Sequence, residues 1–172
     1  MRQITFFLPL LLICMTSTAS FANANDVQYS NAEYGFAVKV PAALHVQKFE
    51  PPAPDHGIAI DLSSGGRLWI NASYDASFLG SAKAALSQII SDENIKPDPI
   101  IRDKKLAGLE AAEISFHTRD QAAVRVVIFR SRNDAVPIIY TLGLDIHGSR
   151  VKQDKKLLNR IIRSFSLLPL PK

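Results

Sequence analysis

The stretch Leu109–Leu144 reads LEAAEISFHTRDQAAVRVVIFRSRNDAVPIIYTLGL, in which three apolar segments are separated by two polar turns. Apolar and polar residues alternate in the first segment, which is typical of a β-strand with one buried side. The second segment is apolar at consecutive positions, so we expect both of its sides to be covered. These patterns predict three consecutive strands, with the middle one central in its sheet, at Leu109–Thr118, Ala122–Ser131 and Val136–Leu144.

Shorter strand patterns precede this stretch. Apolar residues alternate along Gly35–Val40, and Pro41 ends that segment because proline cannot donate to a strand ladder. A second alternating pair surrounds the turn Ser63–Gly66, which is typical of a hairpin. The strands expected in this part of the chain are Val27–Ser30, Gly35–Val40, Ile58–Leu62 and Arg67–Asn71.

Two segments have helical periodicity, Ser81–Asp92 and Ser149–Phe165. Ser149 is the expected N-cap of the second helix. Asp154 falls within the apolar stripe of that helix, and Arg150 lies four residues before it, so we expect the two side chains to pair. The opposite side of this helix is expected to face solvent, with anionic lipid or an acidic partner as the alternative, and carries Lys152, Lys155, Lys156, Arg160 and Arg163.

The order of these elements predicts the fold class. Runs of strands are interrupted by two helices instead of alternating with them one by one, which indicates an α+β fold and not a doubly wound parallel sheet. We expect one globular domain at residues 25–172, with a mainly antiparallel sheet of about six to eight strands and two main helices packed on it.

The first residues have the pattern of a secretory signal peptide. A positive start at Met1–Gln3 is followed by the apolar segment Ile4–Met15 and by small and polar residues that end at Ala24. The apolar segment is shorter than the roughly 20 residues of a membrane span. We therefore expect residues 1–24 to be removed and the protein to be periplasmic or secreted, with no transmembrane segment after processing. Acylation at Cys14, as in lipoproteins, is the weaker alternative because Ile13 precedes it.

Composition limits the chemistry of the remaining chain. Cys14 is the single cysteine, so a chain cleaved after Ala24 has neither a disulfide nor a thiol nucleophile. The formal net charge of the whole chain is +4, which is too small an excess to argue for nucleic acid as a partner. No catalytic residue and no cofactor is assigned from the sequence.

A proline-rich loop at Glu50–Gly57 contains the most reactive-looking cluster. Asp55 and His56 are adjacent, and Asp61 follows six residues after Asp55; carboxylates and an imidazole can bind a divalent metal or act as a base. The same residue types are also ordinary turn residues. Whether this loop binds metal is left open.

The expected binding surface combines the loop Pro51–Gly57 with the neighbouring edge of the hairpin. Trp69 and Tyr74 lie at that edge, and aromatic side chains with polar ends are favoured in recognition. The candidate binding residues are Asp55, His56, Asp61, Trp69 and Tyr74.

Two stretches carry a resemblance to a known family. The segment Tyr29–Pro41, YSNAEYGFAVKVP, resembles the start of PsbP/DcrB-like domains, and Leu158–Phe165 resembles their C-terminal helix. The resemblance implies a PsbP-like fold, a bacterial periplasmic location and a role in binding or assembly, because members of this superfamily are mostly binding or assembly factors. It implies no catalytic residue, and a fold does not fix a function.

The leading hypothesis is a non-catalytic periplasmic binding or assembly-support protein with a protein or small-molecule partner. One alternative is a metal-dependent or hydrolytic enzyme that uses the loop of Asp55 and His56. A second alternative is an immunity-type protein that blocks a toxin in the periplasm, which the size and the export signal allow.

The signal-peptide assignment predicts that the mature protein begins near Asn25. N-terminal sequencing of protein recovered after export would test this position. A lipid attached to Cys14 would contradict the assignment.

Overall fold

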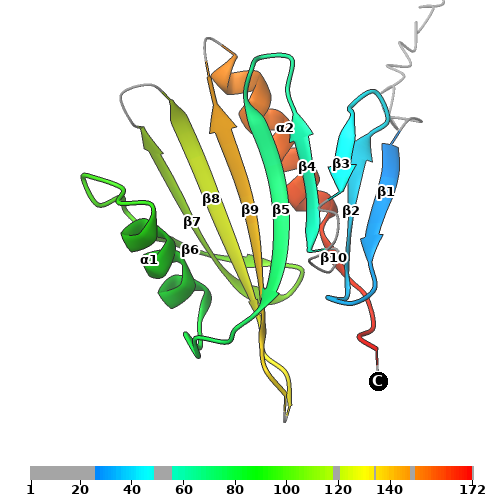
Figure 1. The fold of residues 1–172 in the computed structure, drawn as a ribbon, viewed down its shortest axis with the longest axis vertical. Helices are drawn as coiled ribbons and strands as arrows, with labels where there is room; N and C mark the ends of the chain where they lie inside the picture. Colours follow the sequence, from blue (N-terminus) through cyan, green and yellow to red (C-terminus); the bar gives the residue numbers. More distant parts are fainter. Residues whose placement is uncertain (1–25, 49–55, 118–120, 134, 148–149, 172) are drawn as a thin grey trace, which may run out of the picture.

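The computed structural model describes residues 26–48, 56–117, 121–133, 135–147 and 150–171, and residues 1–24 lie outside it. The described residues form two antiparallel sheets and two helices, with the small sheet beside the large one (Figure 1). The architecture confirms the α+β class and the helices packed on antiparallel strands. No described helix is long and apolar enough to cross a membrane.

The large sheet has seven strands in the order β3-β4-β5-β9-β8-β7-β6, all paired antiparallel. Its strand β8, which lies inside the sheet between β9 and β7, is buried at eight consecutive positions, Ala122–Phe129, as the consecutive apolar residues predict; the middle strand of the seven is β9. The strands of this sheet are β3 (Val46–Lys48), β4 (Gly57–Asp61), β5 (Arg67–Tyr74), β6 (Arg102–Leu106), β7 (Leu109–His117), β8 (Ala122–Arg130) and β9 (Ile138–Ile146).

The small sheet has three strands in the order β1-β2-β10. Its central strand β2 pairs with the start of the described chain on one side and with residues 166–167 near the C-terminus on the other. The strands of this sheet are β1 (Asp26–Asn31), β2 (Phe36–Pro41) and β10 (Ser166–Leu167).

The two helices cover opposite faces of the large sheet (Figure 1). Helix α1 (Ala82–Asp92) contacts β7 and β8, and the Ser81 hydroxyl caps it by accepting the N–H of Ala84 at 3.1 Å. Helix α2 (Val151–Ser164) contacts β9 and also β2 of the small sheet. The larger hydrophobic core therefore lies on the face of the large sheet that α2 covers, and the smaller core lies on the face that α1 covers.

Buried polar groups join the two sheets. The Tyr140 hydroxyl donates to the carbonyl oxygen of Tyr34 at 2.7 Å, across the boundary between β9 and the β1–β2 turn. The Arg130 guanidinium donates to the carbonyl oxygens of Gly35 at 3.1 Å and Leu168 at 3.3 Å. Gly35 has a φ of +62°, and a Cβ there would lie 2.9 Å from the carbonyl oxygen of Leu168, so glycine is favoured at this position.

Three strands of the structure are absent from the sequence-based prediction. β6 has charged residues at four of its five positions, RDKKL, which hides any apolar period and suits an exposed sheet edge. β3 and β10 have three and two residues, which is too short for a period to show.

The expected pairing of Asp154 with Arg150 is wrong. Arg150 precedes α2 with non-helical dihedral angles and donates to the Ser63 hydroxyl at 3.3 Å, so it does not lie over Asp154 as a helical neighbour would. Asp154 is 5% exposed and accepts the Ser64 hydroxyl at 2.7 Å. It also lies in the first turn of α2, where the helix dipole favours a carboxylate. The expected cap Ser149 lies outside the described residues.

Asp154→Ala should lower the free energy of unfolding by about 0.5–3 kcal/mol, the usual range for losing a buried polar contact. Urea unfolding of the double mutants should show coupling of more than about 0.5 kcal/mol with Ser64→Ala, because these side chains share a hydrogen bond. Combination with Arg150→Ala should be additive within about 0.5 kcal/mol. Coupling to Arg150 in place of Ser64 would contradict the structure.

Candidate functional site

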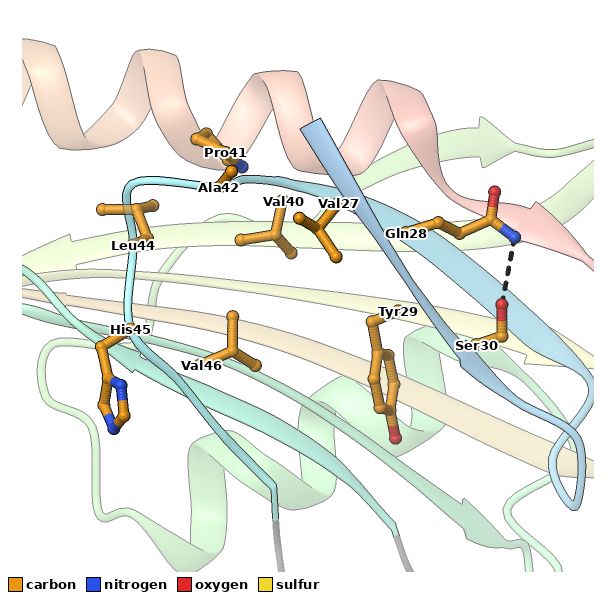
Figure 2. A pocket seen from close by; sticks show the side chains of 10 residues that line it. All are labelled: Val27, Gln28, Tyr29, Ser30, Val40, Pro41, Ala42, Leu44, His45 and Val46. Atoms are coloured by element: carbon orange, nitrogen blue, oxygen red, sulfur yellow. Dashed lines mark hydrogen bonds between the residues drawn. The ribbon is translucent and has the colours of Figure 1, made fainter. Parts of the chain in front are cut away.

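A groove of about 540 Å³ lies between β1, the end of β2 and the chain that leads into β3 (Figure 2). Its volume is within the range of about 300–1,000 Å³ that is usual for small-molecule sites. We refer to this space as the β1–β3 groove, and the described residues that line it are Val27, Gln28, Tyr29, Ser30, Val40, Pro41, Ala42, Leu44, His45 and Val46.

The groove exposes a side chain that the strand pattern directs inward. Val27 alternates with Tyr29 and Asn31, which are 8% and 3% exposed, and it is paired with Val40, which is 1% exposed. Val27 itself is 58% exposed. Because alternate residues share one face of a strand, this valine lies over the interior side of the small sheet, and the described residues leave more than half of its surface uncovered. The groove is therefore an unfilled continuation of the core.

The lining is apolar at its centre and polar at its sides. Figure 2 shows Val27, Val40, Leu44 and Val46 around the open space, and Val40 is the most deeply buried of them. His45 is exposed at the edge of the lining, and the side chain of Gln28 donates to the Ser30 hydroxyl at 3.1 Å. This arrangement can hold an apolar body and offer a few hydrogen-bonding groups beside it.

A second cluster forms around Tyr34, where two residues expected to bind meet. His56 Nδ1 lies 2.8 Å from the Tyr34 hydroxyl and 2.8 Å from the carbonyl oxygen of Ala72. Because a carbonyl only accepts, Nδ1 carries a proton that it donates to Ala72, and the Tyr34 hydroxyl oxygen lies within reach of the same N–H. The Tyr34 ring also packs against Tyr74 at 5.2 Å between centroids, and the Arg132 guanidinium lies 5.8 Å from the Tyr74 ring.

The Tyr34 hydroxyl is held in its neutral form. Burial raises the pKa of Tyr34 to about 12, with smaller contributions from the negative charges of Glu33 and of ionised Tyr74. The adjacent Gly57 lets β4 pass close to the backbone of β5, because a Cβ on Gly57 would lie 1.9 Å from the carbonyl oxygen of Ile70. Tyr34 and His56 thus form a hydrogen-bonded joint between the small sheet and β4–β5.

Trp69 lies on the other face of the large sheet, in a cluster around a buried arginine. Arg125 is 5% exposed and lies 5.3 Å from the Trp69 ring and 5.5 Å from the Phe116 ring. Its guanidinium pairs with Glu93 at 3.0 Å and with Asp145 at 2.8 Å, which balances its charge.

The indole of Trp69 also covers Gly143, where a Cβ would lie 2.1 Å from the ring. Its Nε1 donates to Asp145 at 3.4 Å. Trp69 is therefore half-buried and committed to packing on β9 and β8, while Tyr74 keeps 41% of its surface exposed.

The candidate residues do not form one site. Asp61 is exposed on β4, where it accepts Gln47 Nε2 at 3.0 Å and lies 3.8 Å from Arg67. Asp61 comes five positions after His56, which corresponds to about 17 Å along an extended backbone. Asp61 therefore cannot act together with His56, and Asp55 lies outside the described residues. Among the described residues, no group of three or more His, Cys, Asp or Glu could hold a metal ion.

The β1–β3 groove was not found from the sequence. The alternation of Val27 and Tyr29 indicates a strand with a buried side, and nothing in that period shows that Val27 stays uncovered. The groove depends on tertiary structure, because its width is set by how far the segment Pro41–Val46 lies from β1.

Comparison with solved structures shows where this architecture occurs elsewhere. The solution structure of cyanobacterial PsbP (CyanoP) from Synechocystis sp. PCC 6803 superposes with a TM-score of 0.58 at 13% identity, covering 89% of this chain and 98% of that one. The Ran-binding protein Mog1p of Saccharomyces cerevisiae gives 0.51 at 8% identity, with 83% and 95% covered. LpqN of Mycobacterium tuberculosis, described as involved in cell envelope biogenesis, gives 0.50 at 12% identity, with 84% and 91% covered.

These similarities confirm the expected fold and carry no functional residue, because the identities are low. No protein-family model matches the chain, and no curated protein sequence does.

The raised pKa of Tyr34 makes stability depend on alkaline pH. In the unfolded chain a tyrosine ionises near pH 10, so the neutral hydroxyl stabilises the fold fully below that pH and its contribution is lost as pH rises through about 12. Urea unfolding across this range should show a fall in stability that is smaller in Tyr34→Phe. An identical pH dependence in the two proteins would contradict the assignment.

Proposed function

We propose that this chain, which has a PsbP-like fold, is an exported periplasmic binding or assembly-support protein without catalytic activity. The observation that carries the proposal is the β1–β3 groove, in which Val27 is 58% exposed on the interior side of the small sheet. An uncovered apolar side chain costs free energy in water, and a ligand that covers it recovers that cost. An unfilled groove of this size therefore favours the binding of a ligand that covers Val27.

The lining indicates the class of ligand. Val27, Val40, Leu44 and Val46 supply an apolar wall, and His45 supplies a hydrogen-bonding group at its edge. We infer a small amphiphilic molecule, with an apolar body against the valines and a polar end near His45. Sites with mostly apolar linings and few polar groups are typical of such ligands.

The structural neighbours are consistent with an accessory role. Mog1p is named for binding Ran, and LpqN is described as involved in cell envelope biogenesis. These roles belong to those proteins, and what supports the same kind of role here is the groove together with the fold. The periplasmic location rests on the signal-peptide pattern of residues 1–24.

Filling the groove should weaken ligand binding without unfolding the protein. Val27→Trp places a larger side chain in open space, so we expect the affinity for the fluorescent apolar probe N-phenyl-1-naphthylamine to fall at least about tenfold, a loss that corresponds to about 1.4 kcal/mol of binding free energy. Probe titration followed by fluorescence measures this change, and urea unfolding checks that stability is kept.

The matched control is Val136→Trp, which adds the same side chain at a valine that is 40% exposed and is not among the groove residues. This variant should bind the probe as the natural protein does. Equal affinity in both variants, or no saturable binding by the natural protein, would refute the proposal.

A further inference from the structure

Helix α2 concentrates positive charge on its outer side. At 100° per residue, Lys152, Lys156, Arg160 and Arg163 lie opposite the buried residues of the helix, and the half-buried Lys155 lies at the margin, next to Ile162. We call these five cations together the basic face of α2, with Lys155 at its margin.

The charge of this face is largely uncompensated. Arg160 pairs with Asp26 of β1, whereas the other four cations have no ion pair within the part of the chain that the structure describes. The single acidic residue of the helix, Asp154, is 5% exposed and faces the core. The formal net charge of the whole chain is only +4, so the basic face is a local concentration of charge and not a property of the whole surface.

The apolar side of α2 is already used. Its buried residues belong to the larger core, and the helix packs on β2 and β9. The helix therefore cannot turn an apolar face toward a bilayer, and any contact through the basic face must be electrostatic. Lys152 and Arg163 are eleven residues apart, which places the cations in a row about 16 Å long on a firmly held helix.

We propose that the basic face of α2 adsorbs to the surface of bilayers rich in anionic phospholipid. Charge complementarity supports this partner, since each lysine near an anionic leaflet adds to binding and several can act together. The composition favours lipid over an acidic protein: protein interfaces are depleted in lysine and centre on aromatic residues, whereas this face has three lysines, two arginines and no aromatic residue.

The test uses vesicles of phosphatidylcholine with about one third phosphatidylglycerol, at low ionic strength, because salt screens exposed charges. Lys152→Gln/Lys156→Gln should lower the vesicle partition coefficient about 30-fold, the combined factor for two lysine contacts. Vesicles of phosphatidylcholine alone should bind neither the natural protein nor this variant. The natural protein and all variants are prepared with the same N-terminus, so differences in binding come from the substituted lysines.

The matched control is Lys83→Gln/Lys105→Gln, which removes the same charge from α1 and from the β6 edge, where both lysines are exposed. This variant should change the partition coefficient less than about threefold, as expected for loss of net charge away from the contact. Equal losses in the two double variants would overturn the proposal. Binding to polyglutamate in place of vesicles would also overturn it and would assign the face to an acidic protein.

Discussion

The two sheets are held together by the contact between Tyr140 and the β1–β2 turn. The Tyr140 hydroxyl donates to the Tyr34 carbonyl, and its ring packs edge-on against Phe36 at 5.5 Å and Phe165 at 5.2 Å. One side chain of β9 thereby fixes the small sheet and the end of α2 at once. Burial raises the pKa of Tyr140, which keeps the hydroxyl neutral and able to donate. The β1–β3 groove exists because this joint sets the small sheet at one end and leaves its other end, near Val27, uncovered.

The elements with a clear hydrophobic period were predictable from the sequence, and the arrangement of the two sheets was not. β8 is an interior strand covered on both faces, and the consecutive apolar residues 124–129 indicate this from the sequence. The charged edge strand β6 and the two-residue β10 carry no such signal. The division into two sheets depends on Arg130 and Tyr140 reaching backbone carbonyls that are distant in sequence, and no local pattern encodes that choice.

The candidate site was less predictable from the sequence than the fold. His56 and Tyr74 do lie in one cluster, and they meet through Tyr34, for which no sequence pattern indicated a binding role. Trp69 was expected to take part in binding because aromatic side chains are favoured in recognition. In the structure its ring packs against β9, where Gly143 has no side chain to prevent the contact. Exposure is a property of the assembled fold, so a residue type alone cannot distinguish a structural tryptophan from a binding one.

The pairing of β2 with β10 has a consequence for the order in which the chain folds. Strands β7, β8 and β9 are consecutive hairpins, whose local contacts form early because little chain must be closed. The third strand of the small sheet, β10, consists of Ser166 and Leu167. The next residue, Leu168, supplies the carbonyl oxygen that accepts from Arg130. The small sheet is therefore complete only when residues 166–168 are in place, so β2, near the start of the described residues, obtains its full set of partners after the hairpins of the large sheet have formed.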